Sequence, residues 1–130
     1  MRFVTIDEVL AIHSRMLEVG GGREGIHDFT LLHSAIERPK AQFSGTFLYA
    51  SIWLMAAAML HSLVKNHPFE DGNKRTAYFS TMKFLFDNGY DLIARHKQII
   101  KFMVGVDVKN TSVEKIADWL EKNSKKRKNI

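Results

Sequence analysis

The sequence predicts an all-α fold, a compact bundle of about six helices around one central buried helix. Apolar residues recur at helical spacing in several segments, and no long segment alternates between apolar and polar residues. The chain has only two prolines, Pro39 and Pro68, so long helices are allowed. Its 130 residues, 45 % of them hydrophobic, are typical of one ordinary globular domain.

Two helices are predicted in the N-terminal third. Thr5 and Glu8 form a capping box, and apolar residues follow them at helical spacing until the glycines at 20–22 end the helix. After a glycine-rich loop, Asp28 is placed to cap a short second helix, which Pro39 closes.

The middle of the chain predicts the core. Residues 40–50 combine Gly, Ser, Thr and aromatic residues, which favours a loop or a short hairpin. From about Leu48 to Asn66 the chain is apolar on nearly every face. An all-round apolar helix is a buried one, so this segment is the predicted central helix.

The C-terminal half predicts three more helices. One starts near Asn73 and ends at 88–89, and residues 90–93 form a brief extended piece. Another helix runs from about His96 to Val106. Thr111 and Glu114 look like a second capping box, which opens the last helix.

Charge patterning divides the chain into a single domain, residues 1–124, and a basic C-terminal tail, residues 125–130. The net charge is +5, and four of these units belong to Lys125, Lys126, Arg127 and Lys128. The rest of the chain is therefore nearly neutral. We expect the tail to be a solvated end, and the sequence does not favour nucleic-acid binding as the main function.

Several classes of protein are excluded by composition. The absence of cysteine rules out a disulfide scaffold, a thiolate zinc site, an iron–sulfur cluster and a cysteine nucleophile. The longest apolar run, Ile52–Leu60, is shorter than the ~20 residues that cross a membrane. Asp7 and Glu8 argue against a signal peptide. We therefore expect a soluble, cytoplasmic protein with no membrane partner.

The segment HPFEDGNKRT, residues 67–76, interrupts two strongly apolar helices with mostly polar residues. A helix that begins after Gly72 presents free backbone N–H groups and a positive dipole end, which suit phosphate. Lys74 and Arg75 add positive charge, and Asn73 adds an amide donor. The competing interpretation of these cations is a solvated first helical turn.

Three further residues of this segment complete a candidate catalytic set. His67 can accept a proton near neutral pH. Beside phosphates, the Asp71 carboxylate is suited to Mg²⁺, although a salt bridge to Lys74 or Arg75 would also explain it. Phe69 is an apolar pin directed into the core. A base, a metal carboxylate and a phosphate cradle within nine residues indicate phosphoryl or nucleotidyl transfer.

This segment resembles the signature of the Fic/Doc superfamily, His-Pro-Phe-x-Asp/Glu-Gly-Asn-Gly/Lys-Arg, at every fixed position. Lys74 stands where Fic adenylyltransferases have Gly, and Tyr78 stands where they have a second Arg. Death-on-curing (Doc) toxins share both departures. The segments from Gly21 to Asp28 and from Leu31 to Pro39 also resemble the N-terminal half of Doc toxins, so the resemblance covers nearly the whole chain.

The resemblance implies a protein kinase of a bacterial toxin–antitoxin module. Doc toxins transfer the γ-phosphate of ATP to a threonine of elongation factor Tu and stop translation. Fic enzymes transfer AMP, so adenylyl transfer is the alternative, and a non-catalytic binding module is a second one. Lys74 would fill the space of one phosphate, and the missing Arg at Tyr78 would remove a clamp on another. We expect ATP to bind in the reverse sense, with its γ-phosphate facing the base.

The resemblance also implies roles for single residues. His67 would deprotonate the target hydroxyl, Asp71 would bind Mg²⁺, and Phe69 would anchor the loop. The phosphates would be held by Gly72, Asn73, Lys74 and Arg75. Residues 40–50 would form a flap that aligns the target segment.

Inhibition is expected to come from a partner protein. The inhibitory motif of Fic enzymes needs Ser or Thr where this chain has Gly20. An antitoxin segment that folds on the toxin would take its place, and nucleic acid would be contacted only through that antitoxin.

Overall fold

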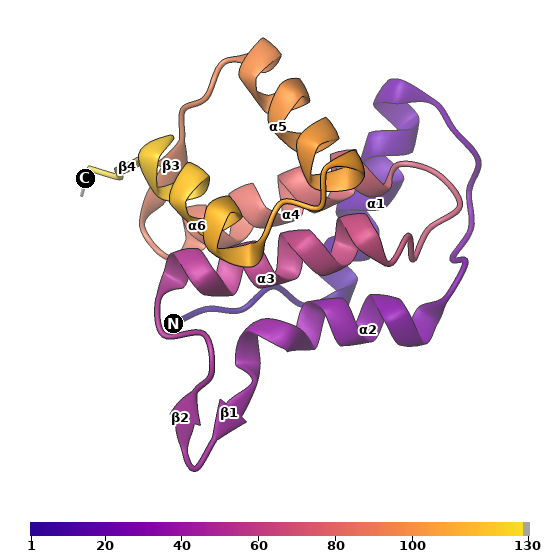
Figure 1. The fold of residues 1–130 in the computed structure, drawn as a ribbon. Coiled ribbons are helices and arrows are strands. Elements are labelled where there is room, and N and C mark those ends of the chain that lie inside the picture. Colours follow the sequence, from indigo (N-terminus) through magenta and orange to yellow (C-terminus); the bar gives the residue numbers. More distant parts are fainter. Residues whose placement is uncertain (129–130) are drawn as a thin grey trace.

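Helix α3 (Ile52–Lys65) runs through the middle of the structure, and the other helices pack around it (Figure 1). The structure is a computed structural model that describes residues 1–128. Its other helices are α1 (Ile6–Gly20), α2 (Phe29–Glu37), α4 (Asn73–Asp87), α5 (His96–Val108) and α6 (Val113–Lys122). The prediction of a mostly helical bundle of six helices with a buried central helix is confirmed for the described residues.

Burial of α3 explains why its sequence is apolar all round. Most of its residues are buried, including Ala56, Ala57 and Ala58, whose small side chains let α4 and α6 approach closely. The helix begins later than the apolar pattern suggests. Its N-cap is Ser51, whose hydroxyl accepts a hydrogen bond from Leu54 N at 3.1 Å. The side-chain cap, and not hydrophobicity, sets this end.

The predicted N-terminal caps are confirmed. Thr5 and Glu8 form both hydrogen bonds of a capping box at the start of α1. Asp28 caps α2 by accepting from Leu31 N at 3.0 Å. The chain does not leave helical geometry at Pro39, because a 3₁₀ turn, η1 (Arg38–Lys40), continues from the end of α2.

The segment 40–50 forms the predicted hairpin. Strands β1 (Gln42–Phe43) and β2 (Thr46–Phe47) pair antiparallel, with Ser44 and Gly45 at positive φ in the turn between them. Figure 1 shows this hairpin projecting away from the helices.

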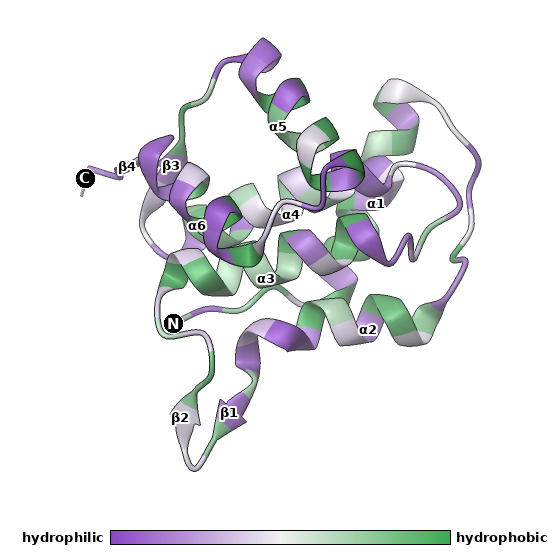
Figure 2. Cartoon of the chain, in the orientation of Figure 1, coloured by the Kyte–Doolittle hydropathy of each residue, from purple (hydrophilic) through white to green (hydrophobic). Residues whose placement is uncertain are grey.

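The predicted capping box of the last helix is wrong. Ser112, not Thr111, is the N-cap of α6, and its hydroxyl accepts from Lys115 N at 3.2 Å. Both hydroxyl residues are plausible caps in the sequence, so a shift of one position is the typical error. Figure 2 shows hydrophobic and hydrophilic residues alternating along α6, as expected for a helix that is buried on one face.

The basic C-terminal segment is partly ordered as a strand, while Lys125, Lys126 and Lys128 stay exposed, as expected of a solvated end. Residues Ser124–Lys126 form strand β4, which pairs antiparallel with β3 (Tyr90–Leu92). The guanidinium of Arg127 lies 3.9 Å from the centre of the Phe86 ring. Lysine is common on such edge strands because it discourages pairing with other chains. Residues 129–130 of the expected tail lie outside the described residues.

Within residues 1–128, none of the helices combines the length and the apolar content that a membrane crossing requires.

Candidate active site

The segment between α3 and α4 forms a small polar cavity at one end of the bundle. Gly72 has a φ of 80° and precedes α4 without a side-chain cap. The first-turn N–H groups of α4 therefore have no partner within the helix. A cavity of about 320 Å³ is lined by His67, Glu70, Asp71, Gly72, Asn73, Lys74 and Arg75. The structure thus brings every predicted site residue except Phe69 to one cavity, at the positive end of α4.

Phe69 anchors the loop between α3 and α4 in the core. Its side chain is 2 % exposed and stacks on the His13 ring, with 3.7 Å between ring centres and 8° between planes. The backbone is held on its other side, because His27 N donates to Pro68 O at 2.7 Å and Glu70 N donates to Gly25 O at 3.1 Å. Figure 1 shows the α1–α2 loop beside the α3–α4 loop. This burial supports the anchoring role expected of Phe69.

Asn73 and His13 hold the loop through hydrogen bonds to its backbone. Asn73 Nδ2 donates to Phe69 O at 2.8 Å, and Asn73 Oδ1 accepts from Phe69 N at 3.0 Å. His13 Nε2 lies 2.8 Å from the carbonyl oxygen of Asp71. The side-chain amide of Asn73 is therefore used by the loop itself. Its backbone N–H, at the start of α4, is the group left for a phosphate.

The Asp71 carboxylate is paired with Arg23, which lies on the glycine-rich loop between α1 and α2. Oδ2 accepts from Arg23 N at 2.7 Å and lies 3.6 Å from Arg23 Nε. The expected alternative, a salt bridge to Lys74 or Arg75, is not among its contacts in the described residues. Arg23 also reaches Glu70, with 3.7 Å between Nη2 and Oε2.

The donor set around Asp71 fits Mg²⁺ but not a metal held by protein ligands alone. In residues 1–128 no three His, Asp or Glu side chains gather as a metal site would require. Mg²⁺ is commonly held by one or two carboxylates together with substrate phosphates and water. Both contacts of Asp71 with Arg23 fall on Oδ2, and the carboxylate lines the cavity. Asp71 is thus suited to a metal that arrives with a phosphate.

His67 and Lys74 meet at a carboxylate that the sequence did not single out. His67 has a φ of 46°, a left-handed backbone that is strained for a residue other than glycine. Its Nε2 lies 3.8 Å from Asp107 Oδ1, and Lys74 Nζ lies 3.1 Å from Asp107 Oδ2. The hydrogen bond from Lys74 is the main reason that the pKa of Asp107 lies below its ordinary value. The sole hint in the sequence is an acidic residue within the otherwise apolar end of α5.

Arg75 points away from the loop backbone toward the end of α1. Its Nη1 donates to Met16 O at 2.8 Å, and its Nη2 donates to Gly21 O at 2.9 Å. These carbonyl groups lie at the C-terminus of α1, where a cation is favourable. Arg75 is therefore not the solvated first-turn cation of the competing interpretation, since it joins α1 to the cavity that it helps to line.

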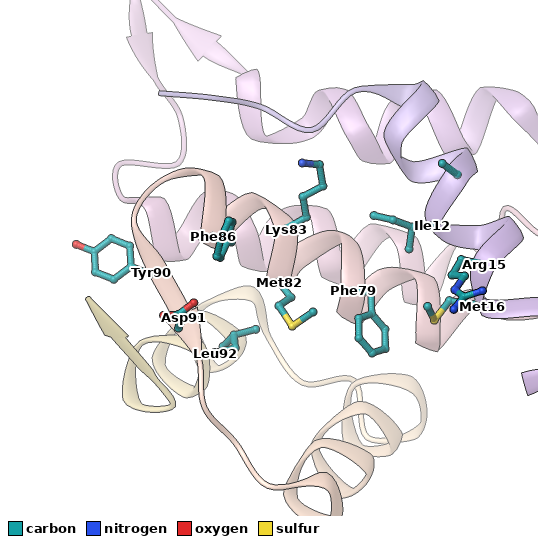
Figure 3. Close-up of a pocket in the computed structure, with 11 residues that line it drawn as sticks. Ile12, Arg15, Met16, Phe79, Met82, Lys83, Phe86, Tyr90, Asp91 and Leu92 are labelled. Carbon is teal, nitrogen blue, oxygen red and sulfur yellow. The ribbon is translucent and has the colours of Figure 1, made fainter. Parts of the chain in front are cut away.

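An apolar groove adjoins the polar cavity. Figure 3 shows its first part, about 560 Å³ between α1, α4 and β3. A second part, about 380 Å³ between α1, α4 and α5, shares Met16 and Phe79 with the first and reaches Lys74 and Arg75. Large apolar side chains on these helices stay exposed, among them Val19, Phe79, Phe86, Ile100 and Val104. This groove ends at the candidate active site.

The fold and this loop define a helical protein of the Fic/DOC family. The sequence profile of that family matches residues 3–85, so the chain belongs to it, and the resemblance seen in the sequence is confirmed. The chain is 45 % identical over 74 residues to "Toxin Doc" of Mycolicibacterium smegmatis, a match that spans 57 % of each protein. It is 28 % identical over 122 residues to "Protein kinase doc" of Escherichia phage P1, across 94 % of this chain and 95 % of the relative.

Proposed function

We propose that the protein is a Doc-type toxin, a Mg²⁺-dependent kinase that transfers the γ-phosphate of ATP to a threonine or serine hydroxyl of a translation factor. Elongation factor Tu is the proposed target, and blocked translation in the bacterial cytoplasm is the proposed result. The observation that carries the proposal is the meeting of His67, Asp71 and the uncapped start of α4 in one cavity. The name of the phage relative, a protein kinase, supports the same reaction.

The transfer step assigns one task to each group. His67 takes the proton of the target hydroxyl while its oxygen bonds to the γ-phosphorus. The bond from that phosphorus to the bridging oxygen breaks, and ADP leaves with the electron pair. The N–H groups after Gly72 and the Lys74 ammonium would bind the phosphate oxygens. Mg²⁺, held by Asp71 when bound, would neutralise phosphate charge.

Two residues favour γ-phosphate transfer over AMP transfer. Lys74 lines the cavity where the resemblance puts a phosphate in Fic enzymes, and its ammonium is held there by Asp107. Tyr78 is buried on α4, and this burial raises the pKa of its phenol, so it stays neutral. A buried neutral phenol does not replace the second arginine clamp. Both residues support the reversed orientation of ATP.

The apolar groove is the proposed docking surface for the antitoxin. An amphipathic helix would fit an open apolar groove of this kind, with an apolar stripe on one face. Arg15, Lys83 and Asp91 lie on one part of the groove, and Lys74 and Arg75 lie at its other end. The excess of cations in this lining favours a segment with acidic residues beside its apolar stripe. A helix bound there would reach the candidate active site and block it. Nucleic acid would be contacted only through the antitoxin.

Phosphate labelling tests the proposed reaction. The purified protein is incubated with Mg²⁺, elongation factor Tu and ATP labelled at either the α or the γ phosphate, with His67→Ala as the control. We expect label from the γ position only, and loss of that label in the variant without loss of folding. Label from the α position would show adenylyl transfer instead. Label from neither, or equal label in the variant, would contradict the proposal.

A further inference from the structure

Asp107 contacts both His67, the proposed base, and Lys74, the proposed phosphate-binding cation. One carboxylate oxygen faces the imidazole of His67 at 3.8 Å, and the other binds the Lys74 ammonium at 3.1 Å. The first distance is too long for a hydrogen bond, so that contact is an electrostatic one. The second is a charge-assisted hydrogen bond. The carboxylate is thus placed between the proposed base and the proposed phosphate-binding cation.

The position of Asp107 is itself fixed. Lys65, at the end of α3, donates to the backbone oxygen of Asp107 and to Asn110 Oδ1, both at 2.7 Å. These bonds tie the C-terminal end of α5 to the last residue of α3, two positions before His67. The Asp107 side chain is 22 % exposed, whereas that of His67 is 57 % exposed. Asp107 is therefore held more firmly than His67, and its carboxylate can fix the position of the more exposed groups that it contacts.

The charges around Asp107 are all basic. Lys74 and Lys65 lie on α4 and α3, and His67 lies on the loop between those helices. The pKa of Asp107 is lowered first by the hydrogen bond from Lys74, and further by the charges of Lys74, His67 and Lys65. Burial opposes this shift and does not overcome it. Asp107 is therefore an anion at any pH at which a histidine acts as a base.

We propose that Asp107 is a positioning residue of the active site, a single carboxylate that holds the His67 ring and the Lys74 ammonium in fixed relation. This inference rests on the proposed function. When His67 carries the proton of the target hydroxyl, it becomes a cation that faces the Asp107 anion. Their attraction stabilises the charge that develops in the transfer step. Asp107 itself makes no bond to the reacting atoms.

The same carboxylate opposes nucleotide binding. Lys74 must share its ammonium between Asp107 and a phosphate, and the Asp107 charge repels that phosphate. Removal of the charge should therefore strengthen ATP binding while it slows transfer. A variant that merely loosened the fold would weaken both. Tighter ATP binding together with slower transfer therefore distinguishes a positioning role from a structural one.

The test compares Asp107→Asn and Asp107→Glu with wild type. The matched control is Asp118→Asn, which removes a helical aspartate that is ion-paired to a lysine on the exposed face of α6. We expect Asp107→Asn to lower kcat by roughly 10- to 100-fold and to bind Mg²⁺–ATP roughly threefold more tightly. Its thermal midpoint should match that of the control, and Asp107→Glu should recover part of kcat. An unchanged kcat, or a loss of kcat accompanied by weaker ATP binding and a lower midpoint, would overturn the inference.

Calorimetric titration with Mg²⁺–ATP keeps this inference distinct from the proposed function. If wild type transfers no phosphate to any target, the proposed kinase activity fails. The titration still measures how far the Asp107 charge weakens the binding of Mg²⁺–ATP by Lys74. Tighter binding by Asp107→Asn, abolished in the Lys74→Gln background, would support the link between the two residues. Equal or weaker binding by Asp107→Asn, or no binding by wild type, would overturn it.

Discussion

The Arg75 guanidinium fills the space that a side chain at Gly20 would need: a Cβ atom at position 20 would overlap Nη1 of Arg75. The last residue of α1 therefore has to be glycine for the Arg75 guanidinium to reach Met16 O and Gly21 O. The resemblance gives this position to the hydroxyl residue of an inhibitory motif in Fic enzymes. In this chain, glycine at position 20 instead leaves room for the Arg75 guanidinium beside the cavity.

Gly20→Ala should alter the site more than the stability. The atom in the way is the end of a flexible side chain, and alanine is the better helix former, so we expect the free energy of unfolding to stay within about 1 kcal/mol of wild type. Phosphate transfer should fall roughly tenfold as Arg75 is displaced. Gly105→Ala is the matched control, since a Cβ there meets only ordinary contact, at 3.8 Å from Thr111 Oγ1. Equal transfer by the two variants would contradict this account of Gly20.

Phe69→Ala should unfold the site loop and destabilise the domain. The variant removes a buried ring and its stack on His13, and such truncations cost about 3–5 kcal/mol. Urea denaturation followed by circular dichroism measures this loss. Phe43→Ala is the control, because Phe43 is 78 % exposed on the hairpin and should change the free energy by less than about 0.5 kcal/mol. A comparable cost for both would show that Phe69 is not an anchor.

Glu8→Gln should destabilise the protein at neutral pH and not in acid. The backbone N–H of Thr5, above all, and the Lys83 ammonium lower the pKa of Glu8 in the folded state. Because the pKa of Glu8 is lower in the folded state, its carboxylate stabilises the fold at pH values above its unfolded-state pKa, about 4.3. This contribution is lost as the pH falls through the folded-state pKa. We expect a cost of about 0.5–1 kcal/mol at pH 7. Urea midpoints at pH 7 and pH 3 measure it, and a difference that persists unchanged at pH 3 would refute it.

Ile100→Asp should weaken antitoxin binding. Ile100 is half exposed in the groove on α5, and a carboxylate there would be desolvated beneath an apolar helix. We expect a loss of at least roughly tenfold in affinity. Val108→Asp is the control on the same helix, since Val108 is exposed and outside the groove lining. Binding of the cognate antitoxin segment, measured by titration, should be unchanged in the control. Equal loss in both variants would argue against the groove.

The parts of the fold that were predictable are those encoded by neighbouring residues. Thr5 with Glu8, and Asp28 with its following turn, carry their caps within four positions. The loop from His67 to Arg75 is likewise a local unit, because Gly72 alone sets the start of α4 and Asn73 closes back on Phe69. Patterns of this kind are visible in a single sequence.

The parts that were not predictable depend on partners far along the chain. Asp107 reaches His67 and Lys74 across more than 30 residues, and Arg23 reaches Asp71 across 48. Neither pair has a spacing that a sequence pattern could reveal. Strand β4 is similar, since a basic run has the same composition whether its backbone is free or paired with β3. Packing of α5 and of the glycine-rich loop onto the site decides these contacts.

The most direct measurement is a crystal structure of His67→Ala bound to Mg²⁺ and a non-hydrolysable ATP analogue. If the cavity is a γ-phosphate transfer site, the γ-phosphate will lie at the start of α4 beside position 67, with Lys74 on its oxygens and Mg²⁺ on Asp71. An α-phosphate beside position 67 would reverse the nucleotide and contradict the kinase account. A nucleotide bound away from the α4 N-terminus would contradict the assignment of the site itself.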